Sequence, residues 1–198
     1  TCSIHSSVLR GRPSIREAVR VMEITGLIKI KRGPKGGMFI TSSMFNPLKE
    51  NFEVLAASPI LSFDHIAEFR EHIESQVVDA AFDLVGDEDI KELEKLVNEA
   101  GQCLTKKRRS IGQFLKNDAR FHLKLSRIAG NAAVVYMLEA IYGLTGYYER
   151  FYRLDNQTLD KSLQDISDIY SAFLNHQRDQ ARILVKNHIR RFNSIHAG

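Results

Sequence analysis

An aspartate and a histidine at helical spacing are the residues of this sequence whose types best suit metal chemistry. Asp118 and His122 stand four residues apart, so both project from one face of the helix that we predict over residues 111–129. His188 lies in the predicted last helix, residues 178–194, and bundles build metal sites from facing helices in this way. A carboxylate and imidazoles suit a divalent ion such as Zn, Ni or Mn. The alternative is a buried hydrogen-bonded pair, Asp118 with His122, and an ordinary polar His188 on a half-exposed helix.

Arg70 is a second candidate, because it interrupts an apolar helical stripe. It follows Phe69 directly, within a helix that we predict over residues 63–85. An inward arginine at such a place can pair through both arms of its guanidinium group with a ligand carboxylate. The alternative is an ion pair with Glu74, four residues on, which contributes only about 0.3–0.5 kcal/mol if it is exposed.

The stretch of residues 11–40 combines a helix, a hairpin and basic side chains. Arg12-Pro13-Ser14 favours a helix start, and Gly26 is typical of a left-handed helix end. Residues 27–31 then alternate apolar and basic, as a half-buried strand does, and a glycine-rich turn leads to a returning strand at 38–40. A helix followed by a hairpin with a basic tip is the shape of a winged helix.

This unit is expected to bind double-stranded DNA. A helix fits the major groove, where arginines contact guanine or phosphates, and a glycine-rich tip can approach the backbone or minor groove. The alternative is that the arginines only solvate an exposed helix face. The predicted DNA-binding residues are Arg12 and Arg16 for bases or phosphates, Ser14 for a phosphate, Arg20 on the same helix, and Arg32 and Lys35 on the wing.

Composition and charge restrict the class of protein. Of the 198 residues, 43% are hydrophobic and 26% charged, which is ordinary for a globular chain of one or two domains. No apolar run approaches the length of a membrane span, and the two cysteines, Cys2 and Cys103, lie far apart, so we expect a cytoplasmic protein. The first 46 residues hold eight Lys and Arg against two Glu, whereas the remainder is mildly acidic. Only the basic N-terminal part is therefore expected to meet a polyanion.

The predicted fold is mainly α. We expect a partial winged helix-turn-helix with a β-hairpin wing over residues 1–41, a linker over 42–62 with one short helix around Leu48–Ala57, and an all-α antiparallel helical bundle over 63–198. Within the bundle, Thr105–Arg109 is interpreted as a solvated turn, and the helix after Gly130 is expected to run from Asn131 to about Leu154.

Two parts of the sequence resemble a known family. Residues 12–40, RPSIREAVRVMEITGLIKIKRGPKGGMFI, resemble the winged helix-turn-helix of GntR-type transcription regulators. The family's first helix has no counterpart, so we expect a chain that begins inside the DNA-binding domain. The helical body resembles the FCD effector domain of the FadR subfamily, on the strength of Glu68-x-Arg70-x-x-x-Glu74, Asp118-x-x-x-His122-x-x-x-Ser126, Gly130-Asn131, and Ala181 with His188.

The resemblance implies a homodimeric repressor whose two winged helices read the half-sites of a palindromic operator. In metal-binding FCD domains the ligands are an Asp and a His four residues apart and two histidines on the last two helices. Asp118, His122 and His188 match three of these places, but the fourth falls on Ile166, which cannot coordinate a metal. Asp165 and Asp168 are near, yet they are expected to point elsewhere. The site is thus either a three-ligand site completed by water or effector, or a site without its metal.

The resemblance also favours an inward Arg70 that binds the effector, a small organic acid with an apolar portion or a fatty-acid-like molecule. A rival hypothesis is a metal-dependent hydrolase, or a ligand-binding protein, that uses Asp118, His122 and His188. A hydrolase needs a general base aimed at the metal-bound water, and no spare Glu or Asp stands at a fixed helical offset for that role. We therefore expect no catalytic residues and a protein that is not an enzyme.

Overall fold

The computed structural model describes residues 12–34, 36–40, 46–56, 58, 61–105, 108–144 and 154–194. The chain divides into two compact units, Thr1–Asn51 and Phe52–Gly198, and each is described by itself. Among the described residues, no helix has the length and apolar content that a membrane span requires.

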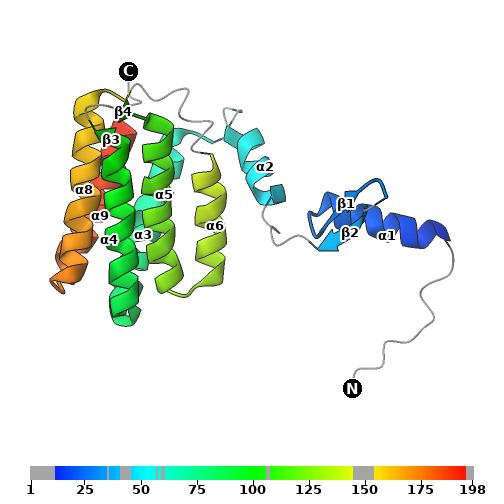
Figure 1. Ribbon diagram of the computed structural model, residues 1–198, viewed down its shortest axis with the longest axis horizontal. Coiled ribbons are helices and arrows are strands. Elements are labelled where there is room, and N and C mark those ends of the chain that lie inside the picture. The colour runs from blue at the N-terminus through cyan, green and yellow to red at the C-terminus, as the bar shows by residue number, and fades with distance from the viewer. Residues whose placement is uncertain are drawn as a thin grey trace. The chain divides into compact units, whose positions relative to one another are not determined.

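The first unit is a helix followed by a two-stranded hairpin, as predicted (Figure 1). α1 (Arg12–Ile24) ends where Gly26 adopts a positive φ of 71°, which is the left-handed conformation typical of helix ends. β1 (Ile28–Lys31) and β2 (Gly37–Ile40) pair antiparallel over all four residues of each strand. A Cβ at Gly36 would lie 2.3 Å from the carbonyl oxygen of Lys31, so the tight tip of the hairpin requires glycine there.

α2 (Asn46–Ala56) occupies part of the predicted linker. Phe52, the first residue of the second unit, packs against a small apolar cluster of the same unit that contains Ile66, Ile141 and Leu144. The segment between the hairpin and the bundle therefore contains a helix with an apolar contact of its own.

The second unit is a bundle of long helices (Figure 1). Helix starts agree with the capping signals of the sequence, because the side chains of Ser62, Asn131 and Asp155 accept hydrogen bonds from free backbone N–H groups of the helices that follow them. Gly130 has a positive φ of 77° at the end of the preceding helix. The helices are α3 (Phe63–Leu84), α4 (Asp87–Cys103), α5 (Ile111–Ile128), α6 (Ala132–Gly143), α8 (Asn156–Leu174) and α9 (Arg178–Ser194).

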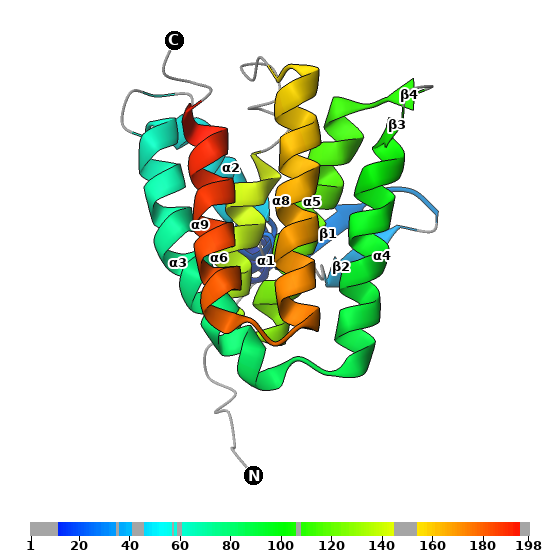
Figure 2. The ribbon, with the colours of Figure 1, turned by 90° about the vertical axis from the view of Figure 1, so that its left-hand side faces the viewer.

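α9 lies between α3 and α8 (Figure 2), and α4 packs against both α5 and α8. The interior that these helices enclose is filled by large side chains that are almost completely buried, among them Phe114, Phe121, Leu138, Ile169 and Phe173. The last helix thus packs against the first long helix of the bundle, and residues far apart in the sequence meet in its core.

Two details differ from the sequence prediction. Instead of a plain turn, Leu104–Thr105 (β3) and Arg108–Arg109 (β4) pair as a very short antiparallel hairpin. α6 ends at Gly143, and the predicted continuation toward Leu154 falls on residues 145–153, which lie outside the described residues.

Candidate metal centre and nucleic-acid interface

The predicted ligands Asp118, His122 and His188 converge in the interior of the bundle. Asp118 and His122 lie on one face of α5, His188 lies on α9, and all three are buried. One ligand atom from each can be chosen so that all lie within 4.8 Å of one another. Nε2 of His188 is 3.3 Å from Oδ1 of Asp118, and the two imidazole rings stack with centroids 5.1 Å apart. Two imidazoles and one carboxylate are a donor set that divalent transition metals accept.

Ile166, at the place where the resemblance puts a further histidine, is completely buried on α8. Its hydrocarbon side chain belongs to the main core cluster. Among the described residues, the cluster of His, Cys, Asp and Glu side chains with metal-ligand spacing consists of Asp118, His122 and His188.

Glu74 holds the other side of the His122 ring. Oε2 of this buried α3 carboxylate lies 2.6 Å from Nδ1 of His122. A metal-binding histidine usually directs its second ring nitrogen at a carboxylate or carbonyl, which fixes the tautomer and the orientation of the ring. With Nδ1 directed at Glu74, Nε2 is the ring nitrogen of His122 that remains for a metal.

Asp165 does not join the three donors, but it contacts the far side of the His188 ring, which the sequence did not indicate. Its Oδ2 lies 3.6 Å from Nδ1 of His188 and 2.9 Å from Nε of Arg191. Asp168, by contrast, accepts a hydrogen bond from Gln164 on its own helix.

The charges of the cluster balance each other. Burial alone would lower the pKa of His188, but the carboxylates of Asp118 and Asp165 outweigh burial and raise that pKa to about 9. Burial alone would raise the pKa of Asp118, but the positive charge of His188 outweighs it, and the pKa lies below its ordinary value. Without a metal the two residues therefore form an ion pair, and a metal must compete with the proton on His188.

Arg70 is mostly buried and points into the same region. Its Nε donates to Oε1 of Glu74 over 2.7 Å, and its Nη2 donates to the hydroxyl of Tyr142, whose ring lies under the guanidinium carbon at 4.4 Å. The Tyr142 hydroxyl in turn donates to Glu74 over 2.9 Å. The ion pair with Glu74 is thus present, but in a buried setting rather than at an exposed surface.

The buried polar atoms of the cluster fit a bound metal. Nε2 of His122 is buried and has no hydrogen-bond partner among the described residues, and Oδ1 of Asp118 has the ion-pair contact with His188 but no hydrogen bond. Leaving such an atom unsatisfied costs about 1–3 kcal/mol. A divalent ion would satisfy both atoms and would suit the donor set.

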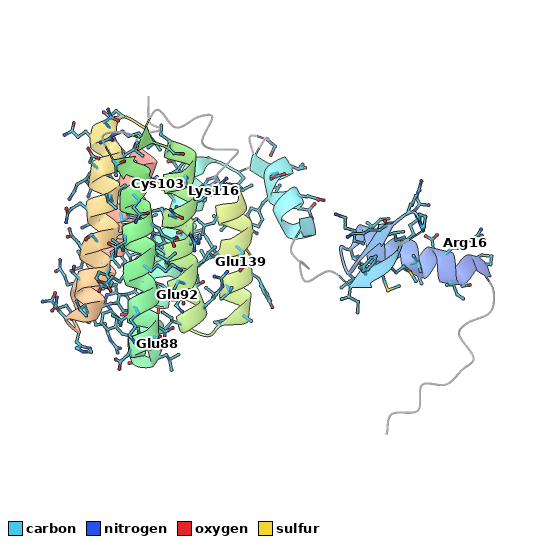
Figure 3. All side chains as sticks on the ribbon, in the orientation of Figure 1. Arg16, Glu88, Glu92, Cys103, Lys116 and Glu139 are labelled. Carbon is cyan, nitrogen blue, oxygen red and sulfur yellow. The ribbon has the colours of Figure 1, made fainter. Side chains whose placement is uncertain are left out.

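The predicted DNA-binding residues of the first unit lie in a basic helix and hairpin. Arg16 and Arg20 lie one turn apart on α1, Ser14 lies in its first turn, and Arg32 follows β1; all four are exposed. Figure 3 shows Arg16 projecting from α1. The side chain of Arg12 and the whole of Lys35 lie outside the described residues.

The sequence did not reveal the partners that surround the cluster. Tyr142, Asp165 and Arg191 reach it from three different helices. For Asp165, the only local signal in the sequence is its place next to Ile166. The direction of the Asp165 side chain depends on how α8 packs against α9.

Comparisons with known proteins identify the helical domain and its relatives. The FCD domain model matches residues 65–191. The chain is 27% identical over 189 residues to the HTH-type transcriptional repressor NanR of Klebsiella aerogenes, and the match covers 91% of this chain and 69% of that protein. NanR of Enterobacter sp. (strain 638) is 28% identical over 123 residues, which cover 61% of this chain and 45% of that protein.

Solved structures show the same fold. Streptococcus agalactiae GntR superposes with a TM-score of 0.74 at 23% identity, covering 93% of this chain and 82% of that chain. E. coli McbR/YncC superposes with a TM-score of 0.59 at 15% identity, covering 92% of this chain and 78% of that chain. The chain therefore belongs to the FCD domain family, and its homologues and fold neighbours are transcription regulators of the GntR type, which are not enzymes.

Proposed function

We propose that this chain is a cytoplasmic, ligand-responsive, sequence-specific DNA-binding regulator of the FadR subfamily, and that it acts as a repressor. The observation that carries the proposal is that one chain contains both an exposed basic helix with a hairpin and an FCD domain with a buried Asp/His/His cluster. The relatives from Klebsiella and Enterobacter are named transcriptional repressors, which favours repression over activation.

For DNA, α1 is proposed to enter the major groove. Arg12 and Arg16 would contact bases or phosphates, Ser14 would hold a phosphate, and Arg20 would add to the positive face of the helix. The hairpin would approach the backbone or minor groove with Arg32 and Lys35. Two copies of the chain would bind a palindromic operator, because a two-fold protein matches a two-fold site.

For the effector, the helical unit is proposed to hold a divalent metal, Zn, Ni or Mn, through Asp118, His122 and His188. Such an ion, when bound, would supply open coordination positions to the effector. The proposed effector is a small organic acid that has an apolar portion, or a fatty-acid-like molecule. Arg70 is the proposed partner of the acid. Because Arg70 already pairs with Glu74 and Tyr142, an effector carboxylate would have to share or replace these contacts. Ligand and DNA would then change each other's affinity by the same factor.

Binding of the full chain to the DNA upstream of its own gene tests the DNA part. In fluorescence anisotropy with excess nonspecific competitor, the Arg12→Ala/Arg16→Ala variant should lose specific binding. The slope of the logarithm of its binding constant against the logarithm of the salt concentration should fall in magnitude by about one for each lost phosphate contact. Lys91→Ala/Lys95→Ala removes the same charge from exposed positions of α4 and should bind as the wild type does. Specific affinity that survives in the arginine variant would remove α1 from the interface.

Metal analysis and operator titrations test the effector part. The protein, purified without chelator, should contain a divalent metal, and a panel of organic acids should include one that shifts operator affinity in the wild type. Absence of metal, together with no response to any acid, would contradict a metal-dependent sensor but would leave the DNA-binding part standing.

A further inference from the structure

Asp165 is a buried carboxylate on α8. It directly precedes Ile166, which stands where the resemblance to metal-binding FCD domains places a fourth ligand. Only 4% of the residue is exposed, and a carboxylate is rarely buried to this extent without partners. Its contacts are with basic groups: Oδ2 lies 2.9 Å from Nε of Arg191 and 3.6 Å from Nδ1 of His188, and Oδ1 lies 3.4 Å from Nη2 of Arg191 and 3.4 Å from Nζ of Lys161.

We propose that Asp165 is a positioning residue of the metal site, which holds His188 through Nδ1 so that Nε2 faces Asp118. This inference rests on the proposed metal site. The inference gives α8 a role at that site, although Ile166 stands on the same helix where the resemblance places a ligand.

The geometry around the His188 ring supports this role. The ring lies between two carboxylates on different helices, with Asp118 of α5 at Nε2, 3.3 Å away, and Asp165 of α8 at Nδ1. Only the Nε2 side can serve a metal shared with Asp118, so Nδ1 must carry the hydrogen and donate it. The Nδ1–Oδ2 separation of 3.6 Å is longer than a hydrogen bond of about 2.9 Å. A metal at Nε2 makes Nδ1–H a stronger donor, so we expect this contact to shorten.

The same arrangement occurs at the other histidine. Glu74 of α3 lies at Nδ1 of His122, as Asp165 of α8 lies at Nδ1 of His188. Each imidazole of the cluster is therefore held by a carboxylate from a helix that supplies no ligand of its own. Carboxylates in this position fix ring orientation and make the histidine a better ligand, and their loss typically weakens metal binding about 10–100-fold.

Arg191 and Lys161 explain why Asp165 itself does not turn toward the metal. Arg191 follows His188 by three residues on α9, so both side chains lie on one face of that helix and meet the same carboxylate. The fork of Arg191 contacts both carboxylate oxygens, which fixes the plane of the group. Lys161, four residues before Asp165 on α8, adds a second positive charge 3.4 Å from Oδ1.

A competing explanation is that Asp165 only fastens α8 to α9 through its ion pair with Arg191. The two explanations differ in what a substitution changes. Loss of a fastening contact lowers the stability of the fold, whereas loss of a positioning contact also weakens the metal and alters its coordination.

The test uses the full chain stripped of metal, titrated with Zn²⁺ against a chromophoric chelator near neutral pH, and loaded separately with Co²⁺ for its visible absorption spectrum. Asp165→Asn keeps the shape and an acceptor oxygen but removes the charge, and Asp165→Ala removes both. Asp168→Asn is the matched control, because Asp168 lies one turn away on α8, is partly buried, and accepts its hydrogen bond from Gln164.

We expect Zn²⁺ binding about tenfold weaker in Asp165→Asn and up to about 100-fold weaker in Asp165→Ala, with changed Co²⁺ bands and no change in Asp168→Asn. Wild-type affinity and spectrum in both Asp165 variants would overturn the inference and leave the metal site intact. A wild-type chain that binds neither ion would instead refute the metal site, and the inference with it. If Asp165→Ala fails to fold by circular dichroism, the isosteric Asp165→Asn decides.

Discussion

Replacing Glu74 by glutamine should expose how much the buried network depends on one negative charge. Glu74 is 2% exposed and is the anion that Arg70 and His122 share. Glutamine keeps the size of the side chain and an oxygen that can still accept from Tyr142, so the substitution removes charge with little change in packing. It leaves the Arg70 guanidinium buried without its counter-ion.

Two independent arguments give the size of the loss. Breaking a buried ion pair by removing one partner costs about 3–5 kcal/mol. Burial alone would raise the pKa of Glu74, but Arg70 and His122 outweigh it and lower that pKa from 4.5 to about 2. At about 1.4 kcal/mol for each factor of ten in the ionisation constant, this drop corresponds to roughly 3 kcal/mol. For a protein of this size, that loss lowers the melting temperature by about 6–12 °C.

Urea and thermal unfolding of the metal-free chain, followed by circular dichroism, measure this loss. Because the folded-state pKa is lowered, ionised Glu74 stabilises the fold above pH 4.5, and this contribution disappears as the pH falls from 4.5 toward 2. The stability gap between wild type and Glu74→Gln should therefore be full at neutral pH and should shrink below about pH 4.5.

Glu71→Gln is the control, because Glu71 forms the ion pair with Arg190 at the surface of the same helix and should change the unfolding midpoint far less. A second variant, Glu74→Gln with Arg70→Met, removes both charges and should recover part of the lost stability. A Glu74→Gln chain within about 1 kcal/mol of the wild type at neutral pH, with no narrowing of the gap in acid, would refute the reasoning.

Three further outcomes are expected. Ile166→His should raise Zn²⁺ affinity by about tenfold in the chelator competition, and no gain would mean that this face of α8 does not reach the ions. His122→Ala should lower the metal content found by elemental analysis, or weaken the shift of the melting temperature caused by an effector; if both stay unchanged, His122 is a structural residue. Asn131→Ala should cost about 1 kcal/mol in urea unfolding, because Oδ1 of Asn131 accepts from the N–H groups of Ala133 and Val134, and an unchanged midpoint would contradict that cap.

Much of the fold could be predicted because its signals are local. The glycine at position 130 and the asparagine after it mark a helix end and a helix start through backbone and capping preferences that act within a few residues. The spacing of Asp118 and His122 likewise depends only on helical geometry. The short β3–β4 pair was missed because two residues per strand are too few to show an alternating pattern.

The surroundings of the cluster could not be predicted, because they depend on how helices pack. Glu74 and Tyr142 are 68 positions apart and meet only because α3 and α6 border the same interior. Asp165 and Ile166 are neighbours in sequence but differ in direction by about 100° around α8, and the packing of α9 against α8 decides which of them meets His188.

The distribution of the cluster over the chain has a consequence for biosynthesis. Two of its donors are made with α5, and the third arrives only with α9, which then has to insert between α3 and α8. A nascent chain that has emerged only through α8 holds an incomplete donor set and cannot retain an ion tightly. Binding of the proposed ion would therefore report that α9 has packed between α3 and α8 in the newly made domain.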